Sequence, residues 1–173
     1  MKKHSTRAQI IALVLVILGI VADQLSKIWV LANLPGRPRT IIEGALSFVY
    51  AENRNMAFGV GDFIPESVKA PLLIGLTSIL AVVLLVMLLR ATDWGTRATL
   101  ALVVSGAIGN IIDRVRLGFV VDFIYWHGGF TWPNFNLADT FICVGAGLMI
   151  LLSFRHGGAR ASEATATGET TAS

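Results

Sequence analysis

The 173-residue sequence contains few charged residues, one cysteine and three histidines. Charged side chains make up 14% of the chain, whereas about 25% is usual for a soluble domain, whose surface must face water. Hydrophobic residues make up 54% and the mean hydropathy is +0.70. The sequence therefore predicts a protein that lies in a membrane, with a length that suits a single domain.

The scarce residue types also exclude several kinds of site. Cys143 lies in an apolar stretch with no second cysteine to pair with, so we expect a small core residue and not a reactive thiol. His4, His127 and His156 lie in tails or a loop without ligand spacing, and we expect neither a metal nor a cofactor. The basic residues behind the net charge of +3 are scattered singly, which argues against nucleic-acid binding.

Four apolar stretches approach the ~20 residues that a helix needs to cross a bilayer. They are Gln9–Trp29, Lys69–Leu89, Ala98–Ile112 and Leu137–Phe154. The first is too long for the core of a cleaved signal peptide, so we interpret it as a retained helix. We predict a membrane all-α fold with four transmembrane helices in one domain, residues 1–156. The Gly-, Ala-, Ser-, Thr- and Glu-rich residues 157–173 are expected to form a disordered cytoplasmic tail.

The two long connectors contain β-branched and aromatic segments that favour strands. Thr40–Ile42 and Leu46–Ala51 lie in the first connector. Phe119–Tyr125 and Phe130–Trp132 flank Gly128-Gly129 in the second, a pattern typical of a hairpin. We expect a small sheet on the outer face, partly within the headgroup layer. The arrangement of Lys and Arg near the helix ends favours cytoplasmic termini, which makes this face periplasmic.

Polar side chains gather at one end of the predicted helices instead of being spread along them. These are Asp23 and Lys27 in the first stretch, Asn110 and Asp113 on the face of the third that also contains Gly106, Asp122 in the next connector, and Asn136 and Asp139 at the start of the fourth. With an even number of spans, all of them lie at the same membrane face. Because ionisable groups in membrane spans are costly, their meeting predicts a functional site.

Each of these groups also has a structural interpretation. Asp23 and Lys27 can form an i, i+4 ion pair that holds a helix end, and Asp113 can pair with a neighbouring cation. Asn136 can cap the fourth helix while Asp139, three residues later, completes a capping-box-like turn. Asp122 is harder to explain in this way, since the residues on both sides of it are apolar. A carboxylate in such a strand needs a partner, or its pKa rises.

The remaining candidate machinery is a pair of aspartates, which suits peptide hydrolysis. One carboxylate takes a proton from water while the other, protonated, donates to the scissile carbonyl, and the two share one proton because like charges held close cannot both ionise. A four-helix proton-coupled transporter of small molecules is the alternative from another class. It would bind near the bilayer midplane and usually shows internal repeats, whereas here the acids lie at one face and no repeat is visible.

Five short blocks of the sequence carry a resemblance to one known family. They are Asp23–Lys27, Asn53–Gly59, Gly109–Arg114, Gly118–Phe123 and Phe135–Asp139, in the family's order and within its four-span layout. The chain resembles lipoprotein signal peptidase, also called signal peptidase II, over nearly everything before the tail. One block departs from the family's pattern, because Asn55 stands where the family usually has glycine.

The resemblance implies an aspartic endopeptidase with Asp122 and Asp139 as its catalytic pair. The residues expected to shape or support the site are Asp23, Lys27, Asn53, Asn110, Asp113, Arg114 and Asn136. The helix dipole favours the charged form of Asp139, and apolar neighbours favour the neutral form of Asp122. We therefore expect Asp139 to be the base and Asp122 the proton donor.

The resemblance also implies a substrate and a place. The substrate would be a prolipoprotein whose lipobox cysteine already carries diacylglycerol, cut just before that cysteine. The enzyme would be a multi-pass protein of the bacterial inner membrane with its site at the periplasmic face. We expect a monomer surrounded by membrane lipid, with no cofactor and no nucleic-acid partner.

Overall fold

The computed structural model describes residues 6–54 and 65–170. In this part of the chain the helices are α1 (Thr6–Asn33), α2 (Glu66–Arg90), α3 (Trp94–Leu117) and α4 (Leu137–Thr170). Each contains a segment long and apolar enough to cross a membrane: Thr6–Asn33, Pro71–Arg90, Trp94–Leu117 and Leu137–Phe154. The predicted four-span architecture is confirmed, and α3 extends beyond the Ala98–Ile112 expected from hydropathy alone.

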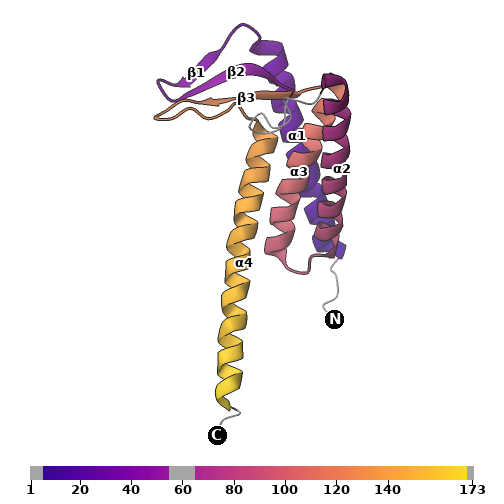
Figure 1. Ribbon diagram of the computed structural model, residues 1–173, viewed down its shortest axis with the longest axis vertical. Helices are drawn as coiled ribbons and strands as arrows, with labels where there is room; N and C mark the ends of the chain where they lie inside the picture. Colours follow the sequence, from indigo (N-terminus) through magenta and orange to yellow (C-terminus); the bar gives the residue numbers. More distant parts are fainter. Residues whose placement is uncertain (1–5, 55–64, 171–173) are drawn as a thin grey trace.

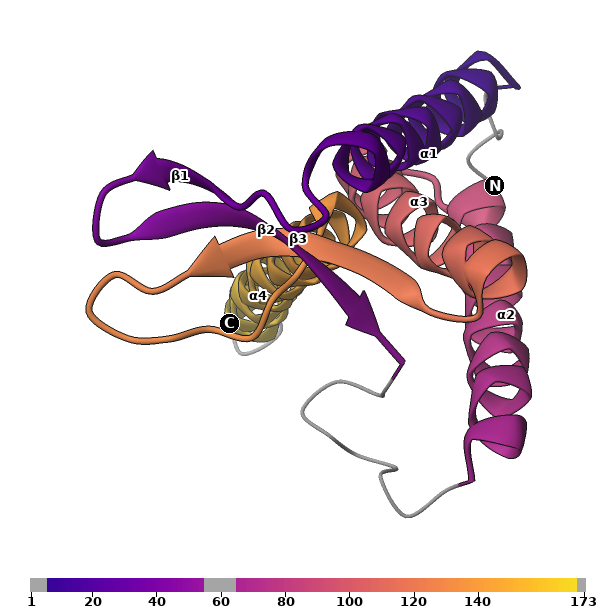
Figure 2. The same ribbon diagram turned by 90° about the horizontal axis from the view of Figure 1, so that it is seen from above.

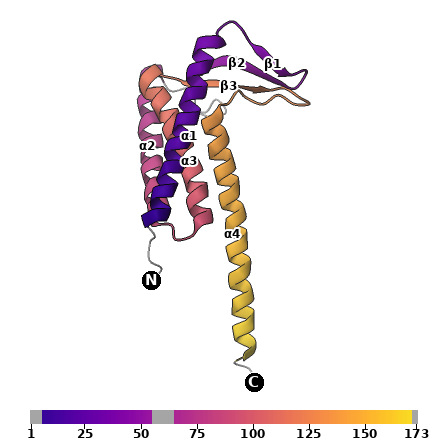
Figure 3. The ribbon, with the colours of Figure 1, turned by 180° about the vertical axis from the view of Figure 1, so that it is seen from behind.

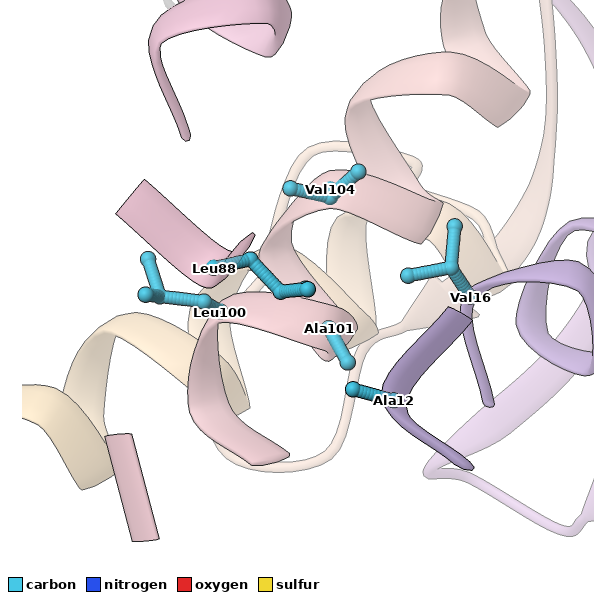
Figure 4. Close-up of a cluster of buried hydrophobic side chains, with 6 residues drawn as sticks. All are labelled: Ala12, Val16, Leu88, Leu100, Ala101 and Val104. Carbon is cyan, nitrogen blue, oxygen red and sulfur yellow. The ribbon is translucent and has the colours of Figure 1, made fainter. Parts of the chain in front are cut away.

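Helix α3 is the centre of the bundle and packs against each of the other three helices (Figure 1). In the most apolar 18-residue segment of α3, 61% of the residues are buried, compared with 11–17% in the other three helices. The apolar side chains of those helices mainly face outwards, where lipid would lie. A cluster of buried residues joins α1, α2 and α3 near the ends away from the sheet (Figure 4). It consists of Ala12, Val16, Leu88, Leu100, Ala101 and Val104.

Small residues let the helices approach one another closely. A Cβ on Gly145 of α4 would lie 2.6 Å from the Val103 side chain of α3, and one on Gly109 of α3 would lie 2.5 Å from Asp23 Oδ2 of α1. Gly147 of α4 makes no such contact, since a Cβ there would meet nothing within 4 Å. Cys143 is likewise exposed and not in the core, because it lies on the outward-facing side of α4.

A three-stranded antiparallel sheet lies at one end of the bundle, in the described part of the chain. Its order is β1 (Arg39–Ile42), β2 (Leu46–Asn53) and β3 (Val120–Trp126), so the middle strand comes from the first connector. The sheet projects sideways beyond the helices (Figures 1 and 2). We call this end of the bundle the sheet end.

The hairpin expected around Gly128-Gly129 forms only in part. Phe130–Trp132 is not a strand; instead the Trp132 amide bonds the Trp126 carbonyl at 3.0 Å, and Phe135 alone bridges to Ile124. Pro133 follows directly, and proline has no amide hydrogen to donate to a ladder. The chain therefore returns to α4 as a loop that bonds β3 through Trp132 and Phe135.

The end of α4 differs from the sequence-based expectation, and Asn55 cannot be compared with it. Helix α4 continues to Thr170, well beyond the other helices in Figure 3, where the sequence predicts disorder from residue 157. The segment is rich in alanine and glutamate, which favour helix, but also in glycine and threonine, which do not. The disordered tail therefore stays a prediction. Asn55, the departure from the family pattern, lies outside the described residues.

Local capping directs the chain from α3 into β3. Gly118 ends α3 with φ 79°, in the left-handed region that glycine adopts most easily, and its amide bonds the Arg114 carbonyl. This turn redirects the chain within two residues, so that β3 begins at Val120 beside the sheet end of α3. Asp122 is thereby placed next to the polar residues of α3.

Candidate active site

The polar residues that the sequence places at one membrane face meet in a single buried cluster at the sheet end. Four elements contribute: α1, α3, β3 and the start of α4. The side chains of Asp23, Asp113, Asp122 and Asn136 are each at most 2% exposed. Because a buried polar group without partners is costly, their hydrogen bonds define how the cluster is built.

Lys27 lies at the centre of one half of this cluster. Its ammonium group is 2.9 Å from Asp23 Oδ2 and 3.0 Å from Asp113 Oδ2, and it donates to Asn110 Oδ1 at 3.0 Å. An ammonium group has three hydrogens, and this geometry offers each an acceptor. The predicted i, i+4 ion pair between Asp23 and Lys27 is therefore confirmed, as one part of a larger network.

The two carboxylates bound to Lys27 also hold the backbone next to the candidate catalytic aspartates. Asp23 Oδ1 accepts the amide of Ala138 at 3.0 Å, directly before Asp139. Asp113 Oδ2 accepts the amide of Val121 at 3.1 Å, directly before Asp122. We call Asp23, Lys27 and Asp113 the clamp, because together they connect the start of α4 to strand β3.

Asn136 connects the two candidate catalytic aspartates. Its side-chain oxygen accepts a hydrogen bond from the backbone amide of Asp139 at 2.9 Å, while its backbone amide donates to Asp139 Oδ2 at 3.3 Å. The predicted cap is thus present, with both bonds of a capping box. The same side chain donates to Asp122 Oδ1 at 2.7 Å and to Asn110 Oδ1 at 3.2 Å. Asn110 in turn donates to Asp139 Oδ1 at 2.8 Å.

Asp122 is held on both oxygens and is 2% exposed. Asn136 donates to Oδ1, and Asn53 donates to Oδ2 at 2.9 Å from the end of β2. Burial and, to a smaller extent, the negative charge of Asp139 together raise the pKa of Asp122 to about 7, against the opposing effect of the two amide hydrogen bonds. Near neutral pH this carboxyl is therefore present in both its protonated and its ionised form.

Arg114 and Gln24 complete the surroundings. The half-buried Arg114 lies within electrostatic range of Asp139, Asp122 and Asp113. Gln24 was not predicted as a site residue, yet its amide nitrogen lies 3.0 Å from Asp113 Oδ1. The sequence did contain a signal for Gln24, because it is a polar amide in an apolar stretch and directly follows Asp23.

The nine residues named from the sequence come together in the structure. They are Asp23, Lys27, Asn53, Asn110, Asp113, Arg114, Asp122, Asn136 and Asp139. Among the described residues, no group of three or more His, Cys, Asp or Glu is arranged to hold a metal ion. What the arrangement offers is two carboxyls, one with a pKa near neutrality, that both accept hydrogen bonds from Asn136. Such a pair suits acid–base chemistry.

Four helices able to span a membrane, with a cluster of polar and carboxyl side chains at one end, define the class of membrane protein to which the chain belongs. The family model described as signal peptidase (SPase) II matches residues 15–155, and the chain belongs to this family of peptidases. The chain is therefore a protease, and the family supports the aspartic class.

Curated relatives agree with this assignment. A lipoprotein signal peptidase of Shewanella loihica is 42% identical over 145 residues, covering 80% of this chain and 83% of the relative. One of Clostridium tetani is 33% identical over 151 residues, covering 84% and 94%. A solved bacterial membrane enzyme, determined by the in meso method, has the same fold with a TM-score of 0.76 at 24% identity, covering 90% of this chain and 93% of that one.

Proposed function

We propose that the chain removes the signal peptides of bacterial lipoproteins, using Asp122 and Asp139 as its catalytic pair. The observation that carries the proposal is the bridge between them: Asn136 donates to the Asp122 carboxylate from its side chain and to the Asp139 carboxylate from its backbone amide, and Asn110 bonds both Asn136 and Asp139. Two carboxyls linked in this way respond to one another's charge, as the influence of Asp139 on the pKa of Asp122 indicates. Family membership supports this reading over that of a transporter.

The proposed reaction is a general acid–base hydrolysis. Asp139, ionised at the start of α4, takes a proton from a water molecule as its oxygen attacks the scissile carbonyl carbon. Asp122, protonated, gives its proton to the carbonyl oxygen, and a neutral tetrahedral diol forms. Asp122, now ionised, then takes a proton from one hydroxyl of the diol as the C–N bond breaks, while protonated Asp139 donates to the leaving nitrogen. Both aspartates return to their starting states.

The surroundings of the site suit a lipid-modified substrate. The proposed substrate is a prolipoprotein whose lipobox cysteine carries diacylglycerol, cut before that cysteine. Its acyl chains would lie in the bilayer beside the exposed apolar faces of the helices, while the scissile bond reaches the polar cluster at the sheet end. Of the two proposed catalytic aspartates, Asp139 is the half-buried one, and the water that the hydrolysis consumes would reach the pair from its side.

We also propose the setting in which the enzyme works. It is a monomer in the bacterial inner membrane, with both termini in the cytoplasm and the sheet end at the periplasmic face. Membrane lipid surrounds the apolar faces of α1, α2 and α4, and nucleic acid takes no part. The direct support is composition and helix length, since the described chain contains four spans and its termini lie away from the sheet (Figure 1).

The experiment is cleavage of a synthetic lipobox peptide by purified protein in lipid. The wild type should cleave the diacylated peptide and leave the same peptide without lipid intact. Asp122→Asn and Asp139→Asn should each lower kcat at least about a thousandfold, and the double variant should lose little more, because a catalytic unit fails as a whole. Glu43→Gln, which changes an exposed carboxylate at the turn between β1 and β2, is the matched control. Near-normal cleavage by either folded aspartate variant would refute the catalytic pair.

A further inference from the structure

Gln24 makes four polar contacts at the edge of the clamp. Its side-chain nitrogen lies 3.0 Å from Asp113 Oδ1, 3.2 Å from Asp23 Oδ2 and 3.2 Å from the Gly109 carbonyl. Its side-chain oxygen accepts a hydrogen bond from Arg116 at 3.1 Å. Gln24 is half-buried and Arg116 is exposed, so the glutamine connects the surface of the sheet end to the buried carboxylates.

The chemistry of these partners allows only one orientation of the amide. Arg116 can only donate hydrogen bonds, whereas the Gly109 carbonyl can only accept them. The amide oxygen must therefore point to Arg116 and the nitrogen to the clamp. Turning the amide over would place two donors against each other on one side and acceptors against each other on the other.

Gln24 gives the clamp a contact that Lys27 does not supply. Lys27 and the Val121 amide both bind Oδ2 of Asp113, so by themselves they leave this carboxylate able to rotate about its terminal torsion. Among the described residues, Gln24 is the donor to the other oxygen, Oδ1. Contacts on both oxygens fix the plane of the carboxylate and hence the position of the Val121 amide, directly before Asp122.

We propose that Gln24 is a positioning residue of the peptidase reaction, which joins Asp23 to Asp113 so that Asp122 and Asp139 stay at one separation. The proposal rests on the proposed function of these aspartates. Asp23 holds the Ala138 amide and Asp113 holds the Val121 amide. A change in the distance between these two carboxylates would therefore change the distance between the side chains of Asp122 and Asp139. Misplacement of reacting groups by about 1 Å can cost on the order of a hundredfold in rate.

The first test compares two glutamines of α1. Gln24→Met keeps the length of the side chain and removes the amide; Gln9→Met makes the same change near the opposite end of the helix, where Gln9 donates to the Leu89 carbonyl at 2.8 Å. Gln24→Met should lower kcat for the diacylated peptide about 10- to 100-fold with KM changed less than about twofold. Gln9→Met should leave kcat near the wild-type value, and thermal unfolding of both variants reports any loss of stability.

The second test uses pH to separate positioning from folding. In Gln24→Glu, a protonated glutamate can still donate one hydrogen bond to the clamp. An ionised glutamate cannot, and it adds a third carboxylate to Asp23 and Asp113, faced by the cations Lys27 and Arg116. Between pH 5 and 8 the ratio of the kcat of Gln24→Glu to that of the wild type should fall as pH rises. The same ratio for Gln24→Met should be flat.

The outcomes separate this proposal from the one on which it rests. If the wild type cleaves and Gln24→Met behaves like Gln9→Met, or its loss lies wholly in KM, the positioning role is wrong and the peptidase function stands. If Gln24→Met does not fold, a pH-independent ratio for Gln24→Glu overturns the role instead. If the wild type leaves the diacylated peptide uncut, the proposed function fails and the role of Gln24 falls with it.

Discussion

Lys27 shows what the buried charges of this protein contribute. It lies 2% exposed between Asp23 and Asp113, and removing three ions from water costs several kcal/mol each before their attraction offsets it. Such a network adds little net stability, yet breaking it by removing one partner costs about 3–5 kcal/mol. The gain is geometric, because the clamp connects α1, α3, β3 and α4 at fixed contacts.

Asp122 is the residue whose charge state links stability to pH. Its pKa in the folded protein is raised from the ordinary 3.8 to about 7, chiefly by burial and then by the charge of Asp139. Between these two values the unfolded chain has released this proton while the folded chain keeps it. Stability therefore decreases as pH rises from about 4 to about 7, and the loss from this group is complete above the folded pKa.

The prediction concerns the thermal unfolding of wild type and Asp122→Asn in detergent. Asparagine does not titrate, so the unfolding temperature of the variant relative to the wild type should increase between pH 4 and pH 7 and level off above about pH 7. The absolute offset is not diagnostic, since asparagine cannot accept both the Asn53 and the Asn136 hydrogen bonds. Thr40→Ala, an uncharged change on β1, should show no such trend. A constant difference from pH 4 to pH 8 would contradict the raised pKa.

At the scale of elements, the contact of α3 with the start of α4 sets the geometry of the site. Gly106 is the closest point, since a Cβ there would overlap the Ala138 carbonyl oxygen and lie 2.8 Å from the Ile142 side chain. The first turn of α4 contains Asp139, and Asn110 on α3 bonds it directly. Any displacement of α4 from α3 therefore changes the position of a proposed catalytic group.

Gly106→Ala should separate the two helices and lower both unfolding temperature and kcat, the latter by about tenfold or more. Gly147→Ala is the matched control, because both glycines lie in membrane spans and Gly147 has open space around its Cβ position. Alanine favours helix by about 1 kcal/mol over glycine, so the control should be neutral or slightly stabilising. The measurements are thermal unfolding and cleavage of the diacylated peptide. Equal behaviour of the two variants would contradict the importance of this contact.

Elements with a strong periodic or compositional signal were predictable from the sequence. The four spans were found by hydropathy, and Thr40–Ile42 and Leu46–Ala51 by their β-branched and aromatic residues. Trp132 was misassigned to a strand because aromatic content outweighed the proline that follows it. Cys143 was misplaced because all faces of a membrane helix are apolar, so composition does not distinguish the packed face from the lipid face.

The site was predictable as a set of residues but not as a set of bonds. The cost of charge in a membrane indicated Asp23, Lys27 and Asp113 together, and their meeting is confirmed. That Asp23 and Asp113 hold backbone amides directly before Asp139 and Asp122 depends on how four elements dock. No pattern within any one segment contains that information.

At the scale of the whole molecule, the described chain has polar groups concentrated at one end and apolar surface around the middle of the helix bundle. Helices α1 and α2, and α4 as far as Phe154, expose large apolar side chains, as expected of surfaces that lipid covers. The sheet and the polar cluster lie at one end, and the turn between α2 and α3 lies at the other (Figure 1). A peptidase for exported lipoproteins is useful only if its polar end faces away from the cytoplasm.

Orientation is therefore the last prediction, tested by cysteine labelling in intact cells. Cys143 is exposed, so the background is Cys143→Ala. In that background Glu43→Cys, on the exposed turn between β1 and β2, should react with a thiol reagent that passes the outer membrane but not the inner membrane. Thr92→Cys, exposed in the turn between α2 and α3, should react only after the inner membrane is permeabilised. Lys and Arg near the termini and this short turn favour the same orientation, because such residues are retained in the cytoplasm. Labelling of Thr92→Cys without permeabilisation, with Glu43→Cys protected, would place the aspartates in the cytoplasm and remove the proposed periplasmic site.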